Sequence, residues 1–262
     1  MSQIVVITGA SSGIGLCTGS LFADKGYKVY SLSRSCPPGS RLFHIPTDVS
    51  SEPSVQNAIE QIIRAEGKID ILINNAGFGI SGAAETTLLE DAKRQFDVNF
   101  FGMFLCVKYA LPYMRAAKQG KIINVSSVAA VLPVPYQSFY SCAKSAVNAF
   151  TLTLANEVRP FGISVAAVMP GDIKTGFTGA RKKNPTTDEA YREREERAVF
   201  RMEKDEQNGM APSAVARCIY KAATKKHPKP LYTVGFQYKT LVTLAKFLPV
   251  SVVNKIEGKM YG

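Results

Sequence analysis

The sequence has very little of what metal sites and histidine-based catalysis require. Only two histidines occur among 262 residues, His44 in a predicted strand and His227 beside Pro228. The five cysteines show no C-x-x-C spacing, so we expect reduced thiols that are mostly buried. Two histidines are too few to make a histidine-ligated metal site or a histidine-based catalytic triad a strong expectation, and no metal site is predicted.

Long apolar runs are also missing. No uninterrupted apolar stretch approaches the length that spans a bilayer, and an apolar strand begins within a few residues of Met1 with no basic leader before it. From these two features we expect a cytoplasmic protein. The chain is 46% hydrophobic, which suffices at this length to bury a full core. With no repeat or linker dividing it, residues 1–262 are expected to form a single α/β domain.

The net charge of +11 is unevenly distributed. Residues 181–262 carry 17 Lys and Arg against 9 Asp and Glu, whereas residues 1–180 are close to balance. The aromatic and glycine signatures of the common nucleic-acid-binding modules are absent, so nucleic acid is not an expected partner. A solvated basic surface is the simplest interpretation, and peripheral contact with an anionic membrane is the alternative.

Apolar strand-like runs alternate with helical patterns, as is typical of a parallel sheet covered by helices. Strands are predicted near 3–8, 28–32, 42–46, 69–73, 120–125, 162–168 and 231–234. Helices are predicted near 13–25, 51–66, 88–117, 138–158 and 211–224. Residues 99–117 are apolar almost all round, which predicts that the outer face of this helix packs against another subunit.

Two segments stand apart from this alternation. Residues 176–210 are rich in Arg and Glu and lack strand signals. Their place after the sixth strand favours a mobile, partly helical lid over a substrate site, with a solvated surface helix as the alternative. Residues 236–262 form a basic amphipathic tail. We interpret it as a helix packed on its own domain or on a partner subunit, and a segment lying on anionic membrane is the alternative.

The first strand runs into a glycine-rich loop that is followed by a helix. Glycine at position 9 permits a tight turn, Gly13 lets the backbone approach a pyrophosphate, and Gly15 lets helix and strand pack closely. The diphosphate then meets the positive end of the helix dipole. At a strand–helix junction this pattern predicts a dinucleotide site. Its candidate residues are Gly9, Ser11, Ser12, Gly13, Ile14 and Gly15.

The end of the second predicted strand has no carboxylate. Dinucleotide folds that bind NAD place an acid there to accept hydrogen bonds from the adenosine ribose, but this chain has Ser33 and Arg34. An arginine can pair bidentately with a 2′-phosphate, and a serine can donate to it. NADP(H) is therefore the predicted cofactor in preference to NAD(H).

Residues 8–15, with Asn74-Asn75-Ala76-Gly77, Asn99, Ser127, Tyr140, Lys144 and Pro170-Gly171, resemble the short-chain dehydrogenase/reductase family in order and spacing. The resemblance covers essentially the whole chain. It implies a Rossmann-type, doubly wound, seven-stranded parallel sheet of order 3-2-1-4-5-6-7. It also implies a nicotinamide cofactor and a homodimer or homotetramer built on the helices at 99–117 and 138–158. The stretch from Leu231 onward resembles the 17β-hydroxysteroid and retinol dehydrogenase branch, which acts on hydrophobic alcohols and ketones.

The resemblance also implies a role for each motif residue. Tyr140 would be the general acid/base, and Lys144, four residues on, would favour the tyrosinate. Ser127 would hydrogen-bond the substrate oxygen, and Asn99 would hold a water that links the lysine to solvent. The implied cofactor contacts are Asp48 and Val49 at the adenine, Asn75, Ala76 and Gly77 behind the cofactor, Tyr140 and Lys144 at the nicotinamide ribose, and Pro170, Gly171, Ile173 and Thr175 at the carboxamide.

The predicted function is the NADP(H)-dependent interconversion of an alcohol and a ketone or aldehyde. Apolar residues at 128–134 follow Ser127 and would line a pocket, which favours a lipophilic, steroid-like or lipid-like small molecule. A reductase of small metabolite carbonyls is the alternative within the enzyme class. A non-catalytic cofactor-sensing protein on the same fold is the alternative outside it, although such proteins typically lose the tyrosine or lysine that this chain keeps.

Overall fold

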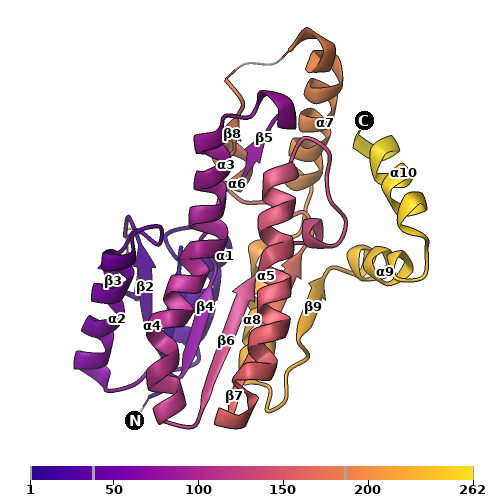
Figure 1. Cartoon of the computed structure of the whole chain (residues 1–262). Helices are drawn as coiled ribbons and strands as arrows, with labels where there is room; N and C mark the ends of the chain where they lie inside the picture. The colour runs from indigo at the N-terminus through magenta and orange to yellow at the C-terminus, as the bar shows by residue number, and fades with distance from the viewer. Residues whose placement is uncertain (1, 37–38, 186–187, 262) are drawn as a thin grey trace.

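The protein is built on one parallel sheet of seven strands (Figure 1). The computed structural model describes residues 2–36, 39–185 and 188–261. The strands of this sheet are β1 (Ile4–Thr8), β2 (Lys28–Ser33), β3 (Phe43–Pro46), β4 (Ile71–Asn74), β6 (Gly120–Val125), β7 (Ile163–Pro170) and β9 (Leu231–Val234). They lie in the order β3-β2-β1-β4-β6-β7-β9. β5 (Ile80–Ser81) and β8 (Lys182–Lys183) are not part of this sheet, so β6, β7 and β9 are its fifth, sixth and seventh strands along the chain. The observed order therefore confirms the predicted order 3-2-1-4-5-6-7.

Helices cover both faces of the sheet. One face carries α1 (Gly13–Asp24) and α8 (Pro212–Thr224), and the other carries α2 (Glu52–Glu66), α4 (Gly102–Ala116) and α5 (Ser138–Glu157). Successive strand residues point to opposite faces, so Val5 packs with the first group and Val6 with the second. Both residues are fully buried. The near-continuous apolar strands of the sequence are thus explained by burial on two faces.

The long helix predicted at 88–117 is interrupted. α3 (Leu89–Phe96) is followed by a π-helical turn, η2 (Asp97–Phe101), before α4 begins. Asn99 therefore lies in a π turn and not within a regular helix, and such turns are frequent at functional sites. The apolar outer face predicted for this region is present, because Phe101 and Phe104 are 48% and 38% exposed.

The segment at 176–210, whose charged composition predicts a mobile insertion, is joined to the rest of the domain by strand pairing. It contains α6 (Phe177–Ala180), α7 (Glu189–Gln207) and a two-residue strand, β8 (Lys182–Lys183), which pairs in parallel with β5 (Ile80–Ser81). The expectation of no strand here was wrong, because so short a strand has no sequence period and depends on a distant partner. Short helical turns complete the chain at η1 (Ala84–Thr86), η3 (Val128–Ala130) and η4 (Arg159–Phe161).

The basic tail forms two helices. α9 (Phe236–Ala245) follows β9 directly, and α10 (Val250–Tyr261) packs against α7 (Figure 1). Val242 packs into a small cluster with Val128 and Leu132, so α9 contacts its own domain. Other apolar residues stay outside, with Phe236 and Phe247 each more than 80% exposed. Within the described ranges, no helix combines the length and the apolar character that crossing a membrane requires.

Candidate active site

The glycine-rich loop crosses the carboxyl end of the sheet between β1 and α1. Gly9 has a φ of +67°, which favours glycine, and this confirms the expected tight turn. A Cβ on Gly15 would lie 2.3 Å from the Gly9 carbonyl oxygen, so no other residue fits there. Backbone is thereby exposed to a cavity of about 980 Å³, which the loop lines with Gly9, Ser11, Ser12, Gly13 and Ile14.

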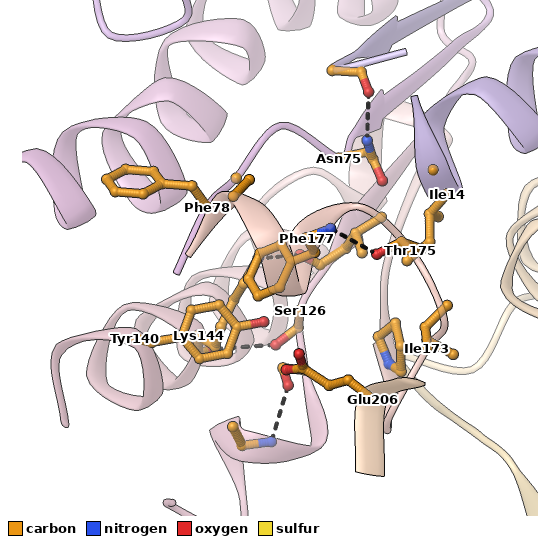
Figure 2. Close-up of a pocket in the computed structure, with 18 of the residues that line it drawn as sticks. Ile14, Asn75, Phe78, Ser126, Tyr140, Lys144, Ile173, Thr175, Phe177 and Glu206 are labelled. Atoms are coloured by element: carbon orange, nitrogen blue, oxygen red, sulfur yellow. Dashed lines mark hydrogen bonds between the residues drawn. The ribbon is translucent and has the colours of Figure 1, made fainter. Parts of the chain in front are cut away.

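Asn75 and Thr8 hold this loop in place. The backbone N–H groups of Asn75 and Ala76 both donate to the Thr8 hydroxyl, at 2.9 and 3.0 Å. The Asn75 amide donates to the carbonyl oxygens of Thr8 and Gly9, at 3.1 Å each (Figure 2). Asn75 therefore supports the loop from behind. The sequence analysis gave Thr8 no role of its own, because its importance arises only where β1 and β4 lie side by side.

The residues that were predicted to contact the adenosine line the end of the cavity next to β2. Arg34 is exposed and lines the cavity with Asp48 and Val49. The Ser33 side chain is buried, and its hydroxyl donates to the Ser35 carbonyl at 2.9 Å, so Arg34 is the better-placed group for a phosphate. Sequence reasoning missed Arg94, which lines the same region from α3.

Hydrogen bonds from Ser50 lower the pKa of Asp48, and the charges of Arg34 and Arg94 lower it further. The Asp48 carboxylate accepts from the Ser50 N–H at 2.9 Å and from its hydroxyl at 2.6 Å. Asp48 is therefore an ionised group that is fixed by its own loop. The two arginines close to it make this end of the cavity cationic overall.

Helix α5 places Tyr140 and Lys144 on one face (Figure 2). Ser127, two residues after the end of β6, lines the cavity with them. The Lys144 ammonium donates to the Val125 carbonyl at 2.9 Å and lies 5.7 Å from the centre of the Tyr140 ring. The Ser127 hydroxyl oxygen accepts from the Ala129 N–H at 3.1 Å. Its own proton stays available for a substrate oxygen.

Asn99 is close to this group but is bonded elsewhere. Its side chain accepts from the Phe78 N–H at 3.0 Å and donates to the Phe78 carbonyl at 2.9 Å. Gly77 separates it from the lysine, since a Cβ there would lie 3.1 Å from Asn99 Oδ1 and 3.6 Å from Lys144 Nζ. Asn99 thus fixes the loop after β4, and the water predicted beside it stays a prediction.

The turn after β7 closes the cavity over the glycine loop. Pro170, Gly171, Ile173 and Thr175 all line it. A Cβ on Gly13 would lie 3.5 Å from the Thr175 side chain, so the two loops face each other across a narrow gap. Ile173 is paired with Met210 through an isolated β-bridge, which ties this turn to the end of α7.

A substrate-sized space adjoins Tyr140 on the side away from the glycine loop. Phe177 of α6 lies beside Tyr140 with the two ring centres 5.8 Å apart (Figure 2). Apolar lining comes from Val128, Leu132, Val134, Met202 and Leu241. The sequence analysis anticipated 128–134 but missed Phe177 and Met202, because segments distant in the sequence bring them here.

Comparison with known proteins agrees with this geometry. A family model described as short chain dehydrogenase matches residues 3–186. A 3-ketodihydrosphingosine reductase from Bacteroides thetaiotaomicron is 42% identical over 256 residues, which cover 96% of this chain and 95% of that protein. The chain belongs to the short-chain dehydrogenase family. This short-chain dehydrogenase is accordingly an oxidoreductase that acts on CH–OH or carbonyl groups, on a fold that binds a nicotinamide cofactor.

Two further relatives extend the comparison. An NADPH-dependent 3-dehydrocapnine reductase from Ornithobacterium rhinotracheale is 31% identical, with 97% of this chain and 95% of that protein covered. A solved short-chain dehydrogenase from Streptomyces avermitilis superposes with a TM-score of 0.85 at 27% identity, covering 98% of this chain and 96% of that chain. The similarity to this dehydrogenase therefore includes the segments around the cavity.

Burial shifts the pKa values of Tyr140 and Lys144 in opposite directions in this dehydrogenase. Burial raises the pKa of Tyr140 to about 12, and the Ser127 hydroxyl opposes that rise. Burial lowers the pKa of Lys144 to about 8. The sequence analysis expected the lysine to favour a tyrosinate. That role of Lys144 stays a prediction for the tyrosinate that proton transfer would leave. In the resting site, removal from water favours the neutral form of each group, so Tyr140 is protonated at neutral pH.

These pKa values predict the pH dependence of carbonyl reduction. Above pH 8, kcat/KM for the cofactor should fall about tenfold per pH unit, because Lys144 loses its proton while Tyr140 keeps its own. Initial rates between pH 6 and about pH 10 with a model ketone measure this. Lys144→Arg retains a cation throughout the range and should show no such decline. A wild-type profile that stays level to the alkaline end contradicts the assignment.

Proposed function

We propose that the protein is an NADPH-dependent reductase that converts a ketone of a lipophilic, long-chain substrate into a secondary alcohol. The observation that carries this proposal is the protonated Tyr140 hydroxyl, which faces an apolar space at one end of a dinucleotide-sized cavity. The 3-ketodihydrosphingosine and 3-dehydrocapnine reductases support it, because their names give lipid ketones as substrates.

The residues at the other end fit NADP(H). A Cβ on Gly9 or Gly15 would meet backbone atoms at less than 3.0 Å, so these glycines let the loop pack closely. The backbone of the loop lines the cavity where a diphosphate would lie. Arg34 is exposed, and no acid occupies the end of β2, which suits a 2′-phosphate. Asp48 and Val49 would hold the adenine, and 170–175 the carboxamide. When bound, the cofactor supplies the hydride.

The chain's own residues then handle the oxygen and its proton. The Ser127 hydroxyl donates a hydrogen bond to the substrate carbonyl, and the Tyr140 hydroxyl transfers its proton to that oxygen as the alcohol forms. The tyrosinate left behind is stabilised by the Lys144 ammonium on the same helix. In the opposite direction the same groups remove the proton from an alcohol.

The cavity favours this proposal over the alternatives. The apolar side chains of Val128, Leu132, Val134, Met202 and Leu241 line the part of the cavity beside Tyr140, which suits a lipophilic substrate better than a small polar metabolite. A cofactor sensor does not need Ser127, Tyr140 and Lys144 to converge, as they do here. A steroid-like substrate receives less support than a long-chain lipid, because the named substrates of the relatives are long-chain amino lipids.

Two proposals concern the surroundings of the site. We propose that residues 176–210 act as a lid, because Phe177 and Met202 of this segment line the substrate space. We propose also that the exposed apolar faces of α4 and α5 pair with a second copy in a homodimer or homotetramer. Phe104 and Leu152, 38% and 40% exposed, would lie in that contact.

Replacement of Tyr140 by Phe removes the proton donor and keeps the ring. We expect kcat to fall at least about a thousandfold, while NADPH binding, followed by fluorescence, is largely retained. Tyr136→Phe is the matched control, because Tyr136 does not line the cavity. A Tyr140 variant with a tenth of wild-type activity would show that another group supplies the proton.

Replacement of Arg34 by Asp should reverse the cofactor preference. Loss of a charge-assisted pair and the added repulsion should lower kcat/KM for NADPH on the order of tenfold to a hundredfold, with little loss for NADH. Arg64→Asp makes the same charge change on exposed α2, away from the cavity. Equal losses with both cofactors at position 34 would mean that Arg34 does not contact the phosphate.

The exposed apolar residues of α9 and α10 carry a proposal about substrate delivery. We propose that this lysine-rich surface rests on anionic lipid, since Leu241 and Tyr261 on its inner side line the cavity. The protein should sediment with anionic liposomes at low salt and be released at high salt. The double variant Phe236→Ser and Phe247→Ser should stay in the supernatant. If the wild-type protein also stays in the supernatant at low salt, the tail has a purely structural role.

A further inference from the structure

The substrate end of the cavity is lined by carboxylates, although the chain as a whole has a net charge of +11. The four acids are Asp172, Asp205, Glu206 and Glu257. Two of them are paired with cations. Arg181, which is buried, pairs with Glu206, and Arg201 lies 3.8 Å from Asp205. In the part of the chain that the structure describes, no ion pair joins a cation to the other two.

Asp172 is the acid on the loop that follows β7. Its carboxylate accepts a hydrogen bond from the Tyr238 hydroxyl, and it lines the same cavity as Tyr140. The charges of Glu206 and Asp172 both raise the pKa of Tyr140. Figure 2 shows the carboxylate of Glu206 pointing toward Tyr140. Negative charge is thus concentrated within reach of the carbonyl that Tyr140 would protonate.

Glu257 of α10 is the second acid, and it is only 9% exposed. Among the described residues no hydrogen bond or ion pair holds its side chain, although it lines the cavity. Tyr261, one helical turn further on, lies close enough for the charges of both Asp172 and Glu257 to raise its pKa. A buried carboxylate without a partner is unfavourable, and a ligand cation offsets that cost.

The two carboxyls respond to burial in the same way. Burial raises the pKa of Asp172, and the charges of Glu206 and Asp205 raise it further. Burial alone raises the pKa of Glu257. A cation bound between them would favour the ionised form of both. The tyrosine rings at 238 and 261 add aromatic faces, which also attract cations.

We propose that Asp172 and Glu257 bind an ammonium group of the substrate, so that the ketone reduced at Tyr140 has a primary amine on a neighbouring carbon. This rests on the proposed ketone reduction. The dihydrosphingosine in the name of the Bacteroides relative is a 2-amino-1,3-diol, and its 3-keto form has that arrangement. Because amine and ketone are adjacent in such a molecule, an acid that lines the same cavity as Tyr140 is where the amine would be recognised.

The test compares two ketones of equal chain length, 3-ketodihydrosphingosine and the 1-hydroxy-3-ketone that lacks the amine. For the wild type, kcat/KM should favour the amino ketone on the order of tenfold to a hundredfold. Asp172→Asn and Glu257→Gln should each reduce this ratio about tenfold. Glu203→Gln removes one charge from α7 at a residue that does not line the cavity, and should leave the ratio unchanged.

The outcomes separate this proposal from the one on which it rests. If the wild type reduces both ketones equally well, or if both variants lose the two activities in proportion, the ammonium site is wrong and the reductase function stands. If the wild type reduces neither ketone, the reductase function is wrong. Binding of a short-chain 2-amino-1,3-diol by calorimetry then decides the site, which requires tighter binding than the diol without an amine and weaker binding by Asp172→Asn.

Discussion

Three hydrogen bonds at the carboxyl edge of the sheet hold the end of β1 against the residues that follow β4. The glycine-rich loop that would bind the cofactor begins at this point. The Thr8 hydroxyl receives two backbone N–H groups from the end of β4, and the Asn75 amide returns to the backbone of β1. Because β1 and β4 are locked at this point, the loop between β1 and α1 has one available path. On that path Gly15 meets the Gly9 carbonyl too closely for any side chain. The shape of the glycine-rich loop therefore depends on an inter-strand contact as much as on its own glycines.

Burial determines the protonation of Tyr140 and Lys144 at the same edge of the sheet, where α5 packs over β6. Lys144 is 5% exposed, and its ammonium is bonded to a backbone carbonyl instead of to Tyr140. In water the lysine charge would help to ionise a phenol, but in this apolar setting each group favours its neutral form. The proton consequently stays on Tyr140, where a carbonyl oxygen can receive it. A protonated Tyr140 is what the proposed carbonyl reduction requires.

The distribution of charge divides the molecule into a basic exterior and an acidic substrate end. Lysine side chains extend from the surface into water and need no partner there. Glu257 is buried and Asp172 is half-buried, and both carboxylates line the cavity, where an unmatched charge is expensive. An amphiphile that carries an amine near its ketone and is drawn from an anionic lipid surface would be complementary to both regions. The two proposals about substrate thus rest on different residues but describe the same kind of molecule.

The sequence by itself determined the sheet, the glycine loop, the Arg34 position and the four-residue spacing of Tyr140 and Lys144. These features follow local rules, since strand and helix periods, turn glycines and helical spacing are properties of neighbouring residues. Only the tertiary structure decided the π turn at Asn99, the β5–β8 pairing and the contacts of Asp172 and Glu257. Tyr238 and Asp172 are 66 positions apart, and no local pattern links them. The pKa values of Tyr140 and Lys144 were likewise decided there, because burial is a property of the packed molecule and not of any one segment.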